Sequence, residues 1–264
     1  MPEATRAGAS SPRLRIATLN VRNTADRWRQ RRELVLAQLG ELAPDVIGVQ
    51  ELRRWPSQTE WITRRLNQSL PAGPPYLYHS AAKTGLWGLW EGIAVLSRLP
   101  VVERGSLDLR GQNRVANWVR VRLVDGSLLE VYNAHLSSGD EALRDSQARL
   151  IMDHMATQPE IPKLVVGDLN ARPASSTLRV LGEQLRSAYA LVHGQEPTKT
   201  WSTPLRPGVG RASVIDYVLV DDHVEVLDAW LTFDRPAPSD PTLFPSDHYG
   251  VAATVRLGPS DGLG

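Results

Sequence analysis

The stretch Lys163-Leu-Val-Val-Gly-Asp-Leu-Asn170 places an acid and an amide two residues apart, directly after a short apolar run. An apolar run that ends in a polar turn predicts a buried strand whose C-terminal end presents side chains at a surface. Because residues i and i+2 of a strand point to the same face, we expect Asp168 and Asn170 to emerge side by side. A carboxylate next to an amide suits an anionic substrate held with a hard cation, although Asp and Asn after a strand also form ordinary turns.

Polar clusters of the same kind end or follow other apolar segments of the chain. They are Thr18-Leu19-Asn20, Val49-Gln50-Glu51, Asn133-Ala134-His135-Leu136, Ile215-Asp216-Tyr217 and Ser246-Asp247-His248. A single polar residue at a strand end is usually a turn. Repeated Asn, Glu, Asp and His at successive strand ends instead predict a site assembled at one edge of a sheet.

Composition sets wide limits on the chemistry. The chain has 264 residues, of which 42% are hydrophobic, enough for one sizeable core or two small ones. A formal net charge of +1 gives no global attraction to nucleic acid, and the absence of cysteine excludes disulfides and thiolate chemistry. The sequence shows neither a leader pattern nor an apolar run of about 18 residues, so we expect a cytoplasmic protein, although a mature secreted chain would look the same.

Hydrophobic periodicity predicts one domain over residues 13–257 with flexible tails at 1–12 and 258–264, because no linker or repeat divides the chain. Helices are predicted at 28–42, 60–70 and 141–155, with Asp26 and Asp140 as caps or near-caps. Strands are predicted at 14–19, 45–50, 93–97, 117–124, 128–134, 163–168, 214–220 and 251–257, with a hairpin at Asp125-Gly126. Strands outnumber helices, so two face-to-face sheets with outer helices fit better than one doubly wound sheet.

In order and spacing, the polar motifs resemble those of the endonuclease/exonuclease/phosphatase superfamily of divalent-metal phosphoesterases, over roughly residues 15–256. The resemblance implies an α/β fold, a four-layered α/β/β/α sandwich of two packed mixed β-sheets flanked by helices. Asn133-Ala-His135-Leu is similar to the version of one motif in deoxyribonuclease-I-like and sphingomyelinase-like members. Abasic-site endonucleases have asparagine in place of that histidine, which argues against DNA-repair specificity.

The expected cofactor is Mg²⁺, with Mn²⁺ or Ca²⁺ as alternatives, because a hard cation takes oxygen ligands and neutralises the charge that protects a phosphodiester. Glu51 is the leading metal ligand, since a glutamate that ends a buried strand is unfavourable unless it is paired or metal-bound. An ion pair with Arg53 or Arg54 would also explain this acid. The family motifs imply that Asn20 and Asp247 assist at the metal.

His248 is the predicted general base, because a pKa near neutrality suits the removal of a proton from water. The resemblance implies that Asp216 orients His248. It also implies that Asp168 aligns the attacking water and that Asn170 hydrogen-bonds the phosphoryl oxygen. The family pattern has arginine where Val214 stands, so that phosphate contact is missing from the motif.

The segment before the strand at 93–97 adds further candidates. Glu91 resembles the deoxyribonuclease glutamate that pairs with the second histidine, so a Glu91–His135 pair is expected to protonate the leaving group. Arg114 aligns with a phosphate-contacting arginine of the same relatives, with a solvated arginine as the alternative. Trp87 and Trp90 lie where a deoxyribonuclease loop touches the DNA minor groove; such indoles could also seat a lipid or pack a strand entrance.

The leading hypothesis is a Mg²⁺-dependent phosphodiesterase, an endonuclease or exonuclease acting on DNA or RNA. A phosphatase and a phospholipid or sphingomyelin-type phosphodiesterase are alternatives, because the motifs fix phosphoryl chemistry better than the group attached to it. A catalytically silent binding scaffold is the alternative from a different class. The expected partner is a phosphodiester substrate, with nucleic acid favoured, and the expected oligomeric state is a monomer.

Overall fold

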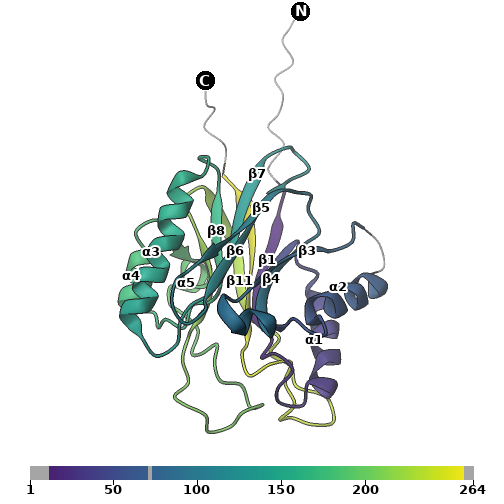
Figure 1. Cartoon of the computed structure of the whole chain (residues 1–264). Helices are drawn as coiled ribbons and strands as arrows, with labels where there is room; N and C mark the ends of the chain where they lie inside the picture. The colour runs from purple at the N-terminus through teal and green to yellow at the C-terminus, as the bar shows by residue number, and fades with distance from the viewer. Residues whose placement is uncertain (1–11, 71–72, 259–264) are drawn as a thin grey trace, which may run out of the picture.

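Two six-stranded mixed β-sheets form the centre of the protein in the computed structural model, which describes residues 12–70 and 73–258 (Figure 1). The first sheet has the order β11-β12-β1-β2-β4-β3 and the second the order β5-β6-β7-β8-β10-β9. The first contains β1 (Leu14–Asn20), β2 (Val46–Arg53), β3 (Leu77–Ala82), β4 (Glu91–Ser97), β11 (Val224–Thr232) and β12 (Gly250–Leu257). The second contains β5 (Val101–Asp108), β6 (Val115–Arg122), β7 (Leu128–His135), β8 (Lys163–Asp168), β9 (Arg186–Ser187) and β10 (Asp216–Val220).

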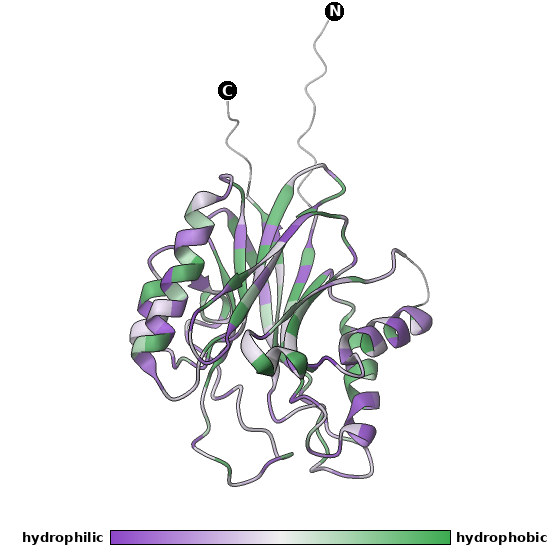
Figure 2. Ribbon diagram, viewed as in Figure 1, coloured by the Kyte–Doolittle hydropathy of each residue, from purple (hydrophilic) through white to green (hydrophobic). Residues whose placement is uncertain are grey.

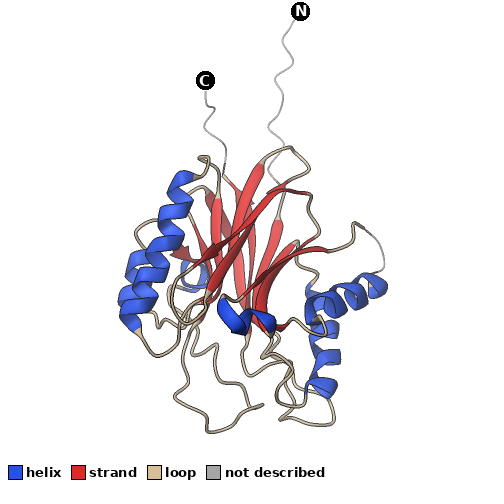
Figure 3. Cartoon of the chain, in the orientation of Figure 1, coloured by secondary structure: helices blue, strands red, loops and turns tan. Residues whose placement is uncertain are grey.

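Helices cover the outer faces of the two sheets and complete the predicted α/β/β/α sandwich (Figure 3). On one side lie α1 (Trp28–Leu42) and α2 (Gln58–Ser69), and on the other α3 (Glu141–Thr157) and α4 (Ser176–Leu181). The short helix α5 (Ala188–His193) packs against β10 and β11, and the 3-10 helix η1 (Gly85–Leu89) precedes β4. No helix in the described part of the chain is long and apolar enough to cross a membrane.

Three apolar cores hold the four layers together. In β8, Leu164 and Val166 enter the core between the sheets, whereas Val165 enters the core beneath α3 and meets Ile151. A third core lies under α1 and α2 and includes Ile47 of β2. Figure 2 shows the hydrophobic residues along the central strands. Because successive side chains face opposite sides, strands buried on both faces have unbroken apolar sequences.

The sequence predicts every inner strand of both sheets and misses the four edge strands, β3, β5, β9 and β11. In β5 most side chains are exposed or half-buried, and the same holds for β3. An edge strand pairs on one side only and carries polar side chains that prevent further pairing. It therefore lacks the apolar run by which a strand is identified, and its position depends on the neighbour to which it binds.

The predicted helix boundaries are correct to within two residues. Asp140 caps α3 as predicted, its side chain accepting a hydrogen bond from the backbone N of Leu143 at 3.0 Å. The prediction for Asp26 is wrong, because α1 has no side-chain cap and Asp26 pairs with Arg22 at 3.1 Å instead. The predicted hairpin joins β6 to β7, and the predicted tails fall outside the described residues except for positions 12 and 258. The single-domain assignment stays a prediction.

The two sheets approach each other closely at Gly48 of β2. A Cβ atom there would lie 2.6 Å from Cγ2 of Val166 and 2.7 Å from Oδ1 of Asn133, both on the facing sheet. The same Oδ1 accepts a hydrogen bond from Nε2 of Gln50 at 2.7 Å. Glycine at this position therefore allows a buried polar contact between the sheets, directly beneath the strand ends that carry the candidate site.

We expect Gly48→Ala to lower the free energy of unfolding by about 1–3 kcal/mol, because overpacking a filled core displaces its neighbours. Gly40→Ala is a matched control, since a Cβ at Gly40 in α1 meets nothing within 4 Å. Removing a glycine from a helix should raise the free energy of unfolding by about 0.5–1 kcal/mol. Equilibrium urea unfolding measures both effects. Equal stability of Gly48→Ala and the wild type would contradict the close approach of the sheets.

Candidate active site

The polar clusters found in the sequence meet at one edge of the sandwich. Parallel pairing of β1 with β2 puts Asn20 next to Gln50, and parallel pairing of β7 with β8 puts His135 next to Asp168. β10 runs antiparallel to β8, so Asp216 also lies beside Asp168. The carboxyl ends of parallel strands and the amino end of an antiparallel strand therefore deliver their side chains to the same place.

Asn20 joins the two sheets at this edge. Its Nδ2 donates to Oε1 of Glu51 at 3.0 Å and to Oδ2 of Asp168 at 2.9 Å. Asn20 is fully buried, and Asp168 is only 2% exposed. The amide therefore holds carboxylates from different sheets close together, one on each side of the interface.

Glu51 reaches this position through an irregularity in β2. The register of β2 against β4 shifts between Val49 and Leu52, and Glu51 has a positive φ of 53°. Bulges of this kind redirect side chains next to functional sites, and a left-handed conformation is unfavourable for a residue other than glycine. The strained backbone at Glu51 turns its carboxylate away from the direction that a regular strand would give it.

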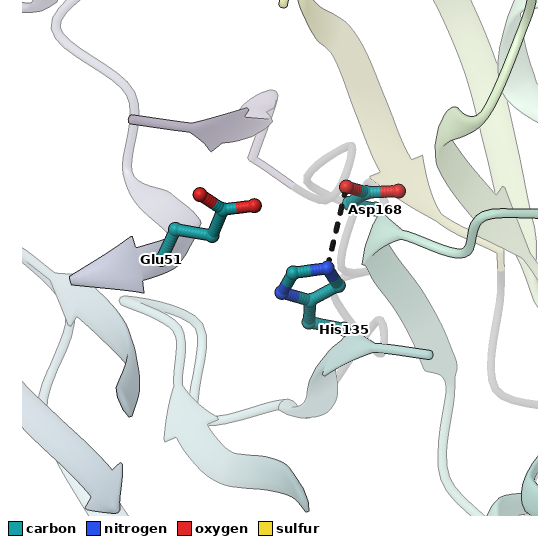
Figure 4. Close-up of side chains that lie close together, drawn as sticks. All are labelled: Glu51, His135 and Asp168. Atoms are coloured by element: carbon teal, nitrogen blue, oxygen red, sulfur yellow. Dashed lines mark ion pairs between the residues drawn. The ribbon is translucent and has the colours of Figure 1, made fainter. Parts of the chain in front are cut away.

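The potential ligand atoms of Glu51, His135 and Asp168 lie within 4.8 Å of one another, and those of Asp168, Asp216 and His248 form a second such group. Figure 4 shows the three side chains of the first group and the contact between His135 and Asp168. Burial, together with the charge of Asp216, raises the pKa of Asp168 to about 7. A buried carboxylate whose charge is disfavoured in this way lacks compensating positive charge. The oxygen-rich set fits a hard divalent cation such as Mg²⁺, with Glu51 and Asp168 as its holders.

The predicted metal ligands Asn20, Glu51 and Asp247 all lie close to Arg22, and their role at a metal stays a prediction. Arg22 lies between the two acids, with Nη1 4.0 Å from Oε2 of Glu51 and Nε 3.6 Å from Oδ2 of Asp247. Arg206 also approaches Asp247, at 3.9 Å. Neither arginine was identified from the sequence, although Arg22 follows the Asn20 motif by two residues. Asp247 is buried. Asp168, predicted to align the attacking water, lies close to Glu51.

His248 is tied to Asp216 as the sequence predicts. Its Nδ1 lies 3.0 Å from Oδ2 and 3.2 Å from Oδ1 of Asp216, and its Nε2 lies 4.0 Å from Oδ2 of Asp168. Burial alone would lower the pKa of His248, but the carboxylates of Asp216, Asp168 and Asp247 outweigh it and raise the pKa to about 10. The contact to Asp216 fixes the ring and leaves Nε2 facing the site.

The predicted Glu91–His135 pair is wrong. Glu91 forms an ion pair with Lys83 and accepts a hydrogen bond from Asn23 at 3.3 Å, and no bond joins it to His135. The sequence did not single out Lys83 as a partner, and its positive charge attracts the carboxylate away. His135 lies with Nε2 3.5 Å from Oδ2 of Asp168, and its buried Nδ1 has no hydrogen-bond partner.

His135 and His248 differ in their electrostatic surroundings. Burial, followed by the charges of Arg114 and Lys83, holds the pKa of His135 well below its ordinary value. His135 is therefore neutral, whereas His248 is surrounded by carboxylates. Two imidazoles on either side of Asp168 thus have opposite tendencies to hold a proton.

Arg114 is buried beside the acids, which contradicts its interpretation as a solvated residue. It is 9% exposed, and its Nε and Nη1 have no hydrogen-bond partner. Burial lowers the pKa of Arg114, against the favourable charges of Asp168, Glu51 and Glu91. A guanidinium with unused donors next to a carboxylate cluster is suited to an anion such as phosphate.

Asn170 and Trp90 lie on the margin of the site. The backbone N of Asn170 donates to Oδ1 of Asp168 at 3.0 Å, and its Nδ2 donates to the carbonyl of Leu136 at 3.0 Å. Asp168 is therefore both a candidate site residue and the acceptor of a turn hydrogen bond. One of the two Nδ2 hydrogens of Asn170 is already used. Trp90 is 57% exposed and follows η1, while the side chain of Trp87 lies outside the described part of the structure.

A buried arginine that the sequence did not reveal holds the surrounding loops. Arg31 of α1 is fully buried and donates to six backbone carbonyls, those of Val21, Arg22, Asn23, Ala25, Asp26 and Pro245. Burial lowers the pKa of Arg31 to about 10, so its charge is retained near neutrality. It connects the loop after Asn20 with the segment that leads to Asp247 and His248.

Comparisons with known proteins agree with this arrangement. The model of the Endonuclease/Exonuclease/phosphatase family matches residues 17–248. The inositol phosphosphingolipids phospholipase C of Saccharomyces cerevisiae is 26% identical over 268 aligned residues, which cover 81% of this chain and 53% of the yeast protein. The chain therefore spans about half the length of that relative.

Solved structures share the fold at low sequence identity. An endonuclease/exonuclease/phosphatase family protein from Bacteroides thetaiotaomicron gives a TM-score of 0.78 with 18% identity, covering 94% of this chain and 99% of that one. The human nocturnin catalytic domain, with bound sulfate anion, gives 0.75 with 20% identity and covers 93% and 94%. A mannosyl-6-phosphatase from Bacteroides thetaiotaomicron gives 0.69 with 18% identity and covers 92% and 100%. These likenesses show the fold alone.

We expect Mg²⁺ to raise the melting temperature of the wild type, because an ion that binds only the folded state stabilises it. Glu51→Gln keeps the side-chain shape but removes its charge, so the Mg²⁺-dependent rise should shrink and turnover should fall by a large factor. Glu160→Gln, in the exposed loop before β8, is the matched control. Full turnover in excess chelator would contradict metal dependence, and an unchanged Mg²⁺ response of Glu51→Gln would exclude Glu51 as a ligand.

Proposed function

The chain belongs to the endonuclease/exonuclease/phosphatase family, and from that premise we propose that it is a divalent-metal-dependent phosphodiesterase acting on nucleic acid. The observation that carries the proposal is the position of Asp168, whose Oδ2 lies 2.9 Å from Nδ2 of Asn20 and within 4.0 Å of both His135 and His248. Carboxylate, amide and two imidazoles therefore surround a single point, at which a phosphorus atom and an attacking water have suitable partners.

A cation held by Glu51 and Asp168 would neutralise the phosphate and stabilise charge that develops on its oxygens. Arg114 supports the same charge through its unused Nε and Nη1. Asn20 keeps the two carboxylates in place, and the free Nδ2 hydrogen of Asn170 is directed to a phosphoryl oxygen. Positive charge and hydrogen bonds that are already in position lower the barrier because they need no reorganisation during the reaction.

His248 accepts the proton of the attacking water at Nε2. The contact of Nδ1 with Asp216 fixes the tautomer and favours uptake of a proton on the opposite nitrogen. The charge of Asp216 contributes most to the raised pKa of His248, followed by the charges of Asp168 and Asp247. A cation held at Asp168 would remove the part of this field that comes from Asp168. Asp168, 4.0 Å from Nε2, aligns the water between them.

His135 donates the proton that the leaving oxygen needs. Its Nδ1 has no protein partner. Burial is the main reason why its pKa is low, and an anionic substrate would offset the further repulsion from Arg114 and Lys83. Glu91 takes part through Lys83 rather than by direct contact with the imidazole. The leaving oxygen would otherwise depart as an alkoxide, and protonation by His135 releases it as a neutral alcohol.

Substrate identity rests on features around this centre. The yeast relative is a sphingolipid phospholipase C and one solved neighbour is a mannosyl-6-phosphatase, so lipid and sugar phosphates are the alternatives. Nucleic acid is favoured here because arginines of α1, of α2 and of the end of β2 line a cavity near the loop after β1. Trp90, exposed next to Glu91, is proposed to touch the substrate, and the same role for Trp87 stays a prediction.

A metal-dependent turnover screen tests the proposed function. The purified chain should hydrolyse a small chromogenic phosphodiester and either DNA or RNA when Mg²⁺ is present, and addition of chelator should stop both reactions. Plasmid DNA, RNA, sphingomyelin, inositol phosphates and nucleotides form the panel. Turnover of sphingomyelin alone would indicate a lipid phosphodiesterase instead of a nuclease. No turnover of any compound would favour a catalytically silent binding scaffold.

We expect His248→Ala and His135→Ala each to lower the chemical rate by roughly 10² or more, in line with general acid–base contributions. The double variant should lose less than the product of the single losses, because the two residues act in one step. His223→Ala is the matched control, since His223 is exposed beyond the opposite end of β10. An unchanged single-turnover rate in His135→Ala would exclude it as the acid.

A further inference from the structure

A cavity of about 880 Å³ lies between the first turns of α1 and α2, beside the end of β2. Its lining contains five arginines and a single acid, Glu60. The arginines are Arg27, Arg29, Arg32, Arg53 and Arg64. They come from both walls, and the N-terminal ends of both helices add partial positive charge to the same space. A chain with a net charge of only +1 therefore concentrates positive charge in one concave place.

This positive charge is only partly compensated by the protein itself. Arg27 pairs with Asp240 at 2.8 Å, and Arg32 contacts Glu33 at 3.2 Å. Arg29 and Arg64 are exposed and have no ion-pair partner within residues 12–70 and 73–258. Concave regions lined by one sign of charge attract ions of the opposite sign more strongly than flat surfaces do. The excess of arginines therefore favours an anionic occupant.

Aromatic rings line the cavity between the arginines. Trp28 and Trp61 meet edge to face, with ring centroids 6.0 Å apart. The guanidinium of Arg32 lies 4.9 Å from the centroid of the Trp61 ring. An aromatic lining with cationic walls suits a ligand that has both anionic groups and flat rings, because indoles stack on bases and arginines bind phosphates.

The loop after β1 contacts both the cavity and the candidate active site. Arg53 donates to Oγ1 of Thr24 at 3.3 Å, and Gln58 donates to the carbonyl of Asn23 at 3.1 Å. Asn23 in turn donates to Glu91 at 3.3 Å. Its chain neighbour Arg22 lies 4.0 Å from Glu51. One loop therefore forms a wall of the cavity and a wall of the catalytic cluster.

We propose that this cavity binds the flanking phosphates of a single-stranded nucleic acid whose scissile phosphate lies at Asp168. The inference rests on the proposed function and names the substrate as a strand. A lipid headgroup or a phosphate monoester concentrates its charge in one place and would engage one wall. A strand carries a phosphate on each nucleotide, so successive phosphates can meet arginines of α1 and of α2.

Binding is measured by fluorescence anisotropy of an end-labelled oligothymidylate, in the His248→Ala background so that the strand stays intact. Arg29→Gln and Arg64→Gln should each weaken binding roughly tenfold, the loss expected for a charged hydrogen bond. The slope of log Kd against log salt should fall by about 0.7 for each phosphate contact removed. Arg149→Gln is the matched control, because Arg149 is an exposed helical arginine of α3 on the opposite side.

Hydrolysis separates failure of this inference from failure of the proposed function. With His248 intact, the cavity variants Arg29→Gln and Arg64→Gln should lower the ratio of strand cleavage to cleavage of the small chromogenic diester. If the wild type is active and both variants bind the strand as tightly as it does, the cavity does not bind the strand. The proposed phosphodiesterase activity would be unaffected by that result. Loss of cosedimentation with phosphatidylserine vesicles, without loss of strand binding, would assign the arginines to a membrane instead. No hydrolysis of either diester by the wild type would refute both.

Discussion

The amide of Asn20 is the interaction on which the site depends. It donates to Glu51 on its own sheet and to Asp168 on the facing sheet, and so sets the distance between two carboxylates that repel each other. Burial and the charge of Asp216 raise the pKa of Asp168, and the charge of Glu51 adds to this rise. A divalent cation relieves the repulsion without disturbing the geometry, because both acids already face the same space. The way the two sheets meet thus creates a place that could hold a cation.

Buried polar contacts keep this geometry in register. Nε2 of Gln50 reaches Oδ1 of Asn133 across the interface, and Nδ2 of Asn133 donates to Oδ1 of Asn117 at 3.0 Å. Hydrogen bonds are directional, so they fix the relative position of sheets that apolar contacts alone would allow to slide. Arg31 does the same for the loops, because its guanidinium binds carbonyls from two distant segments. Arg31 thereby connects the loop after Asn20 with the segment that leads to His248.

Charge is distributed so that catalysis and substrate binding lie in adjacent regions. Acids and imidazoles gather at the strand ends, Arg114 stands beside them, and further arginines line the cavity between α1 and α2. The near-zero net charge of the chain hides this separation, since opposite charges cancel in the sum but not in space. Local potential, and not total charge, decides where an anionic substrate binds. A cation at the acidic centre would reduce its repulsion of a phosphate.

The sequence by itself determined the inner strands and the polar residues at their ends. An inner strand is buried on both faces and must be apolar, so its sequence is distinctive, and the acid, amide or histidine that follows it is equally visible. Edge strands such as β5, exposed on their outer side, carry no such pattern and are defined only by the neighbour that pairs with them. Tertiary structure likewise decided which charged side chains pair with each other. Glu91 pairs with Lys83 and not with His135, and Arg22 lies between Glu51 and Asp247. These contacts join residues that are distant in the chain or lie in loops, where electrostatic energy depends on distances that no local sequence pattern contains.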